Sequence, residues 1–230
     1  MIAQIIEEPS LRERLNVFRD RFQAGNFLAQ KLREYRGKKN VIVLAVPAGG
    51  VPVGYVVAKE LGVPMDVVIV RKIQIPWNTE AGFGAVTWDG ETVLNEPLVE
   101  QLDLTKEEIA ESILKTKRNI QDRLRLFRQD KPMPHLRDKI VIFVDDGLAS
   151  GFTMLAAARS ARKSMPKNIV VAVPTASLGA IELLLPEADK IICLNIRSGP
   201  SFAVADAYEN WYDLTEEEVL KILSEKQSKD

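Results

Sequence analysis

Two adjacent aspartates, Asp145 and Asp146, follow an apolar run and precede small and hydroxyl residues in the stretch VIFVDDGLASGFT, residues 141–153. A buried strand has little structural use for two carboxylates at its end, so the pair suggests a ligand. The residues from Ser150 to Thr153 lead into a predicted helix, and amides at a helix N-terminus with nearby hydroxyls suit a phosphate monoester. Because carboxylates repel phosphate, the pair should face another part of the ligand, and vicinal ribose hydroxyls fit. The stretch indicates a ribose 5-phosphate site, whereas a helix cap with an acidic turn would explain only one aspartate.

The elements that would position these residues alternate between strands and helices. Short apolar runs rich in β-branched residues predict buried strands at 41–46, 66–70, 139–144, 168–173 and 190–195. Apolar periodicity and capping signals predict helices at 11–36, 53–62 and 105–129, from about 153, and after 215. Such alternation predicts an α/β fold: an open, mostly parallel twisted sheet with helices on both faces.

An insertion of about residues 74–131 interrupts this alternation between the second and third buried strands. It starts with a flexible loop around Glu80 and continues with alternating residues around Asp89-Gly90, which predict a hairpin with a type I′ turn. Thr105 and Glu108 then form a capping box that opens a long helix. We therefore expect residues 1–230 to form a single domain with this insertion and a small C-terminal hood at about 195–214.

Composition excludes several classes of protein. The chain of 230 residues is 46% hydrophobic and 27% charged with a net charge of −1, which is typical of a globular protein and gives no support to a global nucleic-acid or membrane role. No apolar stretch is long enough to span a bilayer, and the acidic start does not resemble a signal peptide, so we expect a cytoplasmic protein. A single Cys193 excludes an internal disulfide, and we interpret it and the single His135 as structural.

Three polar stretches follow the first three buried strands: PAGGVPVG, RKIQIP and DDGLASGFT. In open α/β sheets, ligands bind beyond the carboxyl ends of the strands, where loops meet helix N-termini. The three stretches should therefore lie at one edge of the sheet and form one site.

VIFVDDGLASGFT resembles the thirteen-residue signature that binds 5-phosphoribosyl 1-pyrophosphate (PRPP) in type I phosphoribosyltransferases, although Gly147 is smaller than the usual aliphatic residue. Further stretches are similar to a branch of that family whose substrate is not settled. These are LAVPAGGVPVG, VIVRKIQIP, EAGFGAV, VVAVPTAS and FAVADAYENWYDLTEEEV.

The resemblance implies an enzyme that uses PRPP and Mg²⁺ to transfer a 5-phosphoribosyl group to a nucleobase or related acceptor, releasing pyrophosphate. Asp145 and Asp146 would bind the ribose hydroxyls, directly or through Mg²⁺-bound water, as catalytic and metal-binding residues. Arg71 and Lys72 would neutralise the leaving pyrophosphate. The other expected ligand-binding residues are Ala48, Gly49, Gly50, Gly147, Leu148, Ala149, Ser150, Gly151, Phe152 and Thr153.

Other interpretations stay open. Family members often carry arginine at the position of Ala48, so the chain could instead be a PRPP- or nucleotide-binding regulatory protein with little or no catalysis, or one that only hydrolyses or senses PRPP. A nucleic-acid face on the long helix is not the expected interpretation, because Glu111 and Asp122 interrupt its basic residues. Those basic residues are Lys117, Arg118, Arg123, Arg125 and Arg128.

The expected partners are PRPP and a small acceptor, with no membrane partner. The chain itself is expected to form a homo-oligomer, most simply a dimer. In the predicted hood, four aromatic residues could stack on a base or simply pack on the sheet. They are Phe202, Tyr208, Trp211 and Tyr212.

Overall fold

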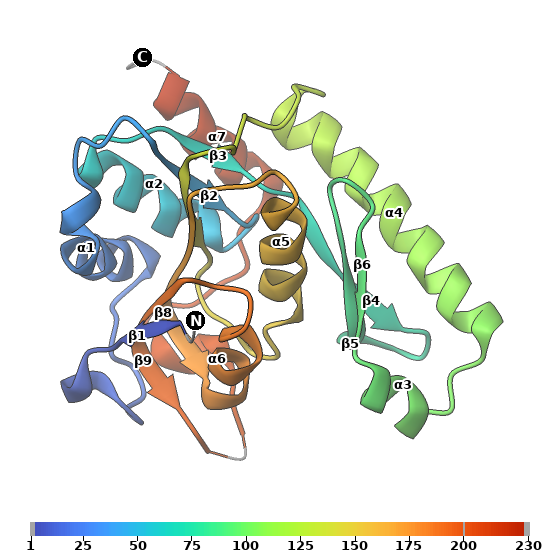
Figure 1. The fold of residues 1–230 in the computed structure, drawn as a ribbon. Coiled ribbons are helices and arrows are strands. Elements are labelled where there is room, and N and C mark those ends of the chain that lie inside the picture. Colours follow the sequence, from blue (N-terminus) through green and yellow to red (C-terminus); the bar gives the residue numbers. More distant parts are fainter. Residues whose placement is uncertain (1–2, 200, 228–230) are drawn as a thin grey trace.

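A central sheet of six parallel strands forms the body of the protein (Figure 1). The computed structural model describes residues 3–199 and 201–227, except the side chains of Glu80, Lys226 and Gln227. Across the sheet, the strands are β1 (Gln4–Ile6), β9 (Lys190–Arg197), β8 (Asn168–Ser177), β7 (Ile140–Val144), β2 (Val41–Ala45) and β3 (Met65–Val67). The predicted parallel α/β sheet is confirmed, with β7, which carries the acidic pair at its end, near the middle.

Helices cover both faces of this sheet (Figure 1). One face packs on α1 (Arg21–Lys31), α2 (Gly50–Leu61) and α7 (Glu216–Gln227), and the other on α5 (Phe152–Arg162) and α6 (Leu178–Leu184). Strand β2 shows why: Val43 and Ala45 belong to the first core, and Ile42 and Leu44 to the second. A strand buried on both faces needs apolar residues at every position, which explains the continuous apolar runs in the sequence.

The insertion forms a second, antiparallel sheet of β4 (Val70–Ile75), β5 (Asn78–Thr87) and β6 (Thr92–Leu94). It packs between α5 and the long helix α4 (Lys106–Arg128), with the short helix α3 (Glu96–Gln101) beyond it (Figure 1). The predicted capping box is present: Thr105 Oγ1 accepts from the Glu108 amide, and the Glu108 carboxylate accepts from the Thr105 amide.

Three local predictions were wrong. The predicted helix at 11–36 is limited to α1 and two short 3₁₀ turns, Pro9–Leu11 and Arg33–Tyr35, because Glu13 and Asn16 have positive φ values of 58° and 51°. The predicted strand 66–70 is divided between β3 and β4, which belong to different sheets. The hairpin at 87–91 has positive φ only at Gly90, so it lacks the two left-handed residues of a type I′ turn.

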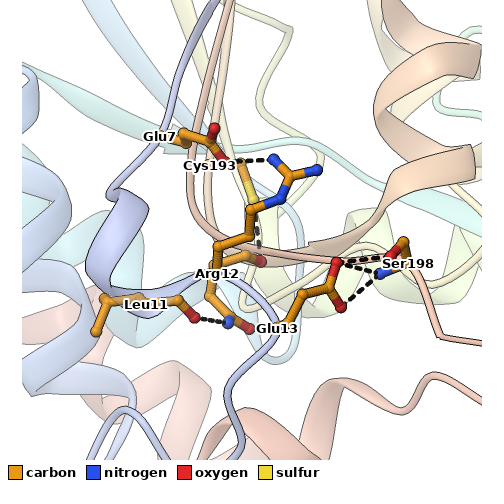
Figure 2. Close-up of polar contacts among 7 residues, drawn as sticks. Glu7, Leu11, Arg12, Glu13, Cys193 and Ser198 are labelled. Carbon is orange, nitrogen blue, oxygen red and sulfur yellow. Dashed lines mark hydrogen bonds and ion pairs between the residues drawn. The ribbon is translucent and has the colours of Figure 1, made fainter.

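The N-terminal segment and the chain after β9 are tied together at the carboxyl edge of the sheet (Figure 2). The amide and hydroxyl of Ser198 donate to the Glu13 carboxylate at 2.6–3.1 Å. The buried Asn195 side chain donates to the main-chain oxygens of Leu11 and Arg14. The N-terminal segment and the chain around the end of β9 therefore lie together at the edge that carries the predicted site. Among the residues that the structure describes, no helix has the length and apolar character needed to cross a lipid bilayer.

Candidate active site

Asp145 and Asp146 lie directly beyond β7, at the carboxyl edge of the central sheet. Asp145 is half-buried, and its Oδ1 accepts a hydrogen bond from the Asp146 amide at 2.9 Å. Asp146 is buried, and its main-chain oxygen accepts from the Tyr208 hydroxyl at 2.6 Å. Packing thus fixes both residues, and Asp145 is the more open of the two.

Asp146 is paired with a residue that the sequence pattern does not reveal. Arg21, the first residue of α1, donates from Nε to Asp146 Oδ2 at 2.9 Å and from Nη1 to the main-chain oxygen of Tyr212 at 2.9 Å. The Arg21 guanidinium lies 3.9 Å from the centroid of the Trp211 ring. The partners are 125 positions apart, so no local motif could have found the pair. The one local signal was Asp20, whose carboxylate caps α1 and marks where the helix begins.

The two aspartates share an unusual electrostatic environment. Burial, followed by the negative charge of Asp146, raises the pKa of Asp145 well above its ordinary value. Burial also raises the pKa of Asp146, although the positive charge of Arg21 opposes that shift. Adjacent carboxylates shielded from water hold a proton more tightly than exposed ones. A cation placed at Asp145 would favour its ionised form and so oppose this shift.

The acidic pair fits a magnesium ion that is only partly held by the protein. Mg²⁺ prefers oxygen ligands and is usually bound through one or two carboxylates together with waters and substrate phosphates. Asp145 and Asp146 offer such oxygens. Within the described part of the chain there is no group of three or more Asp, Glu, His or Cys side chains that could hold a metal ion, so a complete protein cage is absent there.

The loop from Gly147 to Thr153 connects the acidic pair to α5. Leu148 extends the sheet, because its amide donates to Thr175 and its carbonyl accepts from Ser177. Ala149 and Ser150 are exposed, and Gly151 adopts a left-handed conformation with φ of 79° just before α5. The first amides of a helix have no partner within the helix. Among the described residues, nothing accepts a hydrogen bond from the amides of 150–153, so these amides have no partner that a bound anion would have to displace.

Gly147 itself lies under the C-terminal segment. A Cβ atom there would be 2.5 Å from Val204 Cγ1 and 2.8 Å from Thr175 Cγ2. The glycine that departs from the family pattern is therefore the residue that lets the segment 204–207, a 3₁₀ turn, pack directly on the loop.

The loop Pro47–Gly50 packs against the acidic pair. The peptide bond between Pro47 and Ala48 is cis. A Cβ atom on Gly49 would lie 1.8 Å from Asp146 Oδ2, and one on Gly50 would lie 2.7 Å from the main-chain oxygen of Val144. Both positions therefore need glycine because the backbone approaches the end of β7 and Asp146 closely. Ala48 is half-buried and offers only a methyl group at this edge.

Arg71 and Lys72 are adjacent on β4, so their side chains project to opposite faces of the small sheet. Arg71 is half-buried, and burial with the positive charge of Arg123 lowers its pKa. Arg123 lies 3.8 Å from Glu216 in the first turn of α7. Arg71 thus belongs to a charged group between α4 and α7, and the roles of Arg71 and Lys72 toward pyrophosphate stay predictions. The Glu80 side chain lies outside the described residues.

The basic residues of α4 do not form one exposed face. Arg128 is buried and donates to Asp66 and to the main-chain oxygens of Val67 and Pro132. Arg123 is half-buried near Glu216. These two side chains are occupied within the protein, whereas Lys117, Arg118 and Arg125 are exposed. The expectation that α4 is not a nucleic-acid face stays a prediction.

The aromatic residues of the predicted hood are mostly engaged in packing. Tyr208 is buried between Phe18 and Trp211, with ring centroids 5.7 and 5.3 Å away. Trp211 covers Arg21, whereas Tyr212 is 54% exposed. Phe202 lies 4.9 Å from the guanidinium of Arg197. Tyr212 is therefore the one of the four with a largely open ring.

Comparisons with known proteins agree with this geometry. Residues 13–205 match the family described as Phosphoribosyl transferase domain. The Mycobacterium tuberculosis (strain ATCC 25618 / H37Rv) protein named "Putative phosphoribosyl transferase Rv0571c" is 36% identical over 211 residues, which are 91% of this chain and 47% of that protein. Its counterpart in strain CDC 1551 / Oshkosh, named with MT0597, matches to the same extent. The chain thus spans about half the length of the curated relatives it matches.

A solved structure extends the similarity to three dimensions. The crystal structure of TT1426 from Thermus thermophilus is similar with a TM-score of 0.73 and 35% sequence identity. The match covers 90% of this chain and 98% of TT1426. Together with the family match over residues 13–205, which include the acidic pair and both loops beside it, these findings show that the chain belongs to the phosphoribosyl transferase domain family.

Proposed function

We propose that this protein transfers the 5-phosphoribosyl group of PRPP to a nitrogen of a nucleobase or related acceptor and releases pyrophosphate. The observation that carries the proposal is the junction of β7 and α5. There, the acidic pair and the amides of 150–153, which form no hydrogen bond among the described residues, lie on one continuous stretch at the carboxyl edge of the sheet. A ribose 5-phosphate has a diol and a phosphate monoester at its two sides, and this loop offers a matching group to each.

Each part of the site then has a chemical task. The amides of 150–153 bind the 5-phosphate, and Asp145 accepts hydrogen bonds from the ribose hydroxyls. The bond between C1 of the ribose and the pyrophosphate oxygen breaks, a bond from the acceptor nitrogen to C1 forms, and the acceptor loses its proton to solvent. Because the protein forms no covalent bond in this scheme, rate enhancement comes from positioning and from the charges around the leaving group.

The acidic pair also has a task toward a metal ion. Asp145 and Asp146 would hold Mg²⁺ together with oxygens of PRPP, and Mg²⁺ would supply charge neutralisation for the leaving pyrophosphate. Arg71 and Lys72 follow the edge strand β3 and project to opposite faces of the small sheet. Because Arg71 lies with Arg123 and Glu216, we assign Lys72 to the same leaving group.

The acceptor side of the site is assigned by elimination within the hood. Tyr208 and Trp211 are occupied by packing contacts, and Phe202 lies beside Arg197. Tyr212 is exposed and lies close to Arg21, with 6.0 Å from its ring centroid to the guanidinium. We therefore assign the stacking of a planar acceptor to Tyr212.

Calorimetry followed by an activity screen tests the proposal. The first step titrates PRPP with Mg²⁺ into the wild-type protein, Asp145→Asn and Asp103→Asn, an exposed aspartate at the end of α3 that serves as the control. The second step measures pyrophosphate release with a panel of purine and pyrimidine bases. We expect binding to the wild type and the control but not to Asp145→Asn, and pyrophosphate release with at least one base.

Two results would contradict the proposal. If PRPP does not bind, the site assignment fails. If PRPP binds but no acceptor gives pyrophosphate release, the chain is a PRPP-binding protein without transferase activity. The methyl group of Ala48 in the loop Pro47–Gly50, where family members often carry arginine, favours that interpretation.

A further inference from the structure

We propose that Arg21 is a positioning residue of the ribose site, which fixes the Asp146 carboxylate and makes the segment Tyr208–Tyr212 a structural part of that site. The inference rests on the proposed function, because it concerns how the same acidic pair is held. It adds a residue from α1 and a segment from the C-terminal part of the chain, neither of which belongs to the three loops at the sheet edge.

The contacts of Arg21 join three distant segments. Its Nε binds Asp146 at the end of β7, its Nη1 binds the main-chain oxygen of Tyr212, and its plane lies against Trp211. The side chains of Arg21 and Asp146 are only 7% and 13% exposed. A planar guanidinium can donate to a carboxylate while stacking on an aromatic ring, which an ammonium cannot do equally well. The geometry therefore depends on arginine and not only on positive charge.

Three neighbours fix the position of Asp146. Arg21 occupies its Oδ2, the Gly49 backbone lies directly behind that oxygen, and Tyr208 binds its main-chain oxygen. Arg21 also cancels one of the two negative charges. Asp145, Asp146 and Arg21 together then carry a net charge of −1 when both acids are ionised, which lowers the repulsion toward the phosphate groups of a ligand bound on the same loop.

A second buried arginine of this protein provides a comparison. Arg128 is also paired with an aspartate, Asp66, and its side chain is 2% exposed. Arg128 donates to the main-chain oxygens of Val67, Lys131 and Pro132. Its contacts therefore hold the start of the segment after α4 against the end of β3. Arg21 instead contacts an acid of the candidate site. Substitutions at the two arginines can therefore distinguish a loss of stability from a loss of ligand positioning.

The experiment compares Arg21→Met and Arg21→Lys with the control Arg128→Met. Ribose 5-phosphate and inorganic phosphate are titrated into each protein and followed by NMR, and thermal unfolding is measured on the same samples. Both ligands use the loop amides, but only ribose 5-phosphate reaches the acidic pair.

For Arg21→Met we expect ribose 5-phosphate affinity to fall about ten- to hundredfold, the usual effect of losing a charge-assisted contact, with phosphate affinity unchanged within about twofold. Arg21→Lys should recover part of the loss. Arg128→Met should lower the unfolding temperature and leave the ratio of the two affinities unchanged. A purely structural role for Arg21 predicts the same unchanged ratio for Arg21→Met, and that result would overturn the inference.

A further variant covers the case in which Arg21→Met does not fold. Trp211→Leu keeps Arg21 and Asp146 but removes the ring that the guanidinium stacks on, so it should lower ribose 5-phosphate affinity severalfold. If this variant binds ribose 5-phosphate as tightly as the wild type does, the segment 208–212 is not part of the site. If the wild-type protein binds neither ligand, the proposed function fails, and the inference fails with it. Normal binding by the wild type and both Arg21 variants refutes the inference alone.

Discussion

Replacement of Gly49 by alanine should have two opposing effects on the free energy of unfolding. Gly49 has φ of −61° and ψ of −34°, an ordinary helical conformation at the start of α2, so alanine fits the backbone and would reduce the entropy of the unfolded chain. This effect alone predicts stabilisation of about 0.4–1 kcal/mol. The added Cβ would, however, lie 1.8 Å from Asp146 Oδ2, whereas ordinary contacts begin at 3.4 Å. The carboxylate must therefore retreat by about 1.6 Å.

The movement of the Asp146 carboxylate decides whether Gly49→Ala is more or less stable than the wild type. Asp146 Oδ2 lies 2.9 Å from Arg21 Nε, and a shift of this size ends the hydrogen bond. Breaking one buried ion pair costs about 3–5 kcal/mol, so we expect a net destabilisation of about 2–4 kcal/mol. Ribose 5-phosphate affinity should fall as well, because Asp146 loses its position.

Urea unfolding of Gly49→Ala and of the control Gly179→Ala measures the effect. Gly179 lies in the first turn of α6, and a Cβ atom there would contact nothing within 4 Å beyond its own helix. Gly179→Ala should therefore be as stable as the wild type or slightly more so. A double-mutant cycle with Arg21→Met tests the cause, since the two changes should be strongly non-additive if both act through Asp146. Unchanged stability of Gly49→Ala, or full additivity with Arg21→Met, would refute the reasoning.

Three further predictions concern single positions. Because the pKa of Asp145 is raised in the folded state, the unfolded chain ionises first, and stability is lost as the pH rises from the ordinary aspartate pKa to the raised one. Asp145→Asn should therefore melt higher than the wild type at about pH 8, with a difference that shrinks toward about pH 4. Equal melting at both pH values would contradict this. Gly151→Ala places alanine at φ of 79°, so it should lower the free energy of unfolding in urea by about 1–2 kcal/mol and also lower the affinity for phosphate. The control Gly37→Ala, at φ of 67°, should lower only the free energy of unfolding. Burial raises the pKa of the Cys193 thiol, so iodoacetamide should modify it only after unfolding, and rapid labelling of the native protein would show that the thiol is accessible.

Features encoded within a few residues were predictable from the sequence. The capping box at Thr105 and Glu108 and the apolar runs of β2 and β7 depend on near neighbours, and the structure has each of them. The end of β7 also identified the acidic pair, because two carboxylates after a buried strand are unusual in any fold. Periodicity alone was misleading at 11–20, where Glu13 and Asn16 take left-handed conformations that apolar spacing does not report.

Features that depend on distant segments were not predictable. The pairing of Arg21 with Asp146 spans 125 positions, and the aromatic residues that enclose Arg21 come from the far end of the chain. Whether Tyr208 packs or meets a ligand was open in the sequence, because an aromatic residue suits both. Its burial and its hydrogen bond to Asp146 assign it to packing.

The contact between Arg21 and the segment 208–212 has a consequence for the order in which this protein matures during synthesis. The ribosome makes Asp145 and Asp146 more than 60 residues before Trp211 and Tyr212, so a nascent chain that has emerged only as far as α6 can already build four of the six central strands. In that chain Arg21 has neither its aromatic cover nor its main-chain acceptor, and the Tyr208 hydroxyl is missing from Asp146. The sheet can thus exist before the acidic pair has its final surroundings, and the pair gains its contact with Tyr208 and the final position of Arg21 only when the segment 208–212 docks on the folded body.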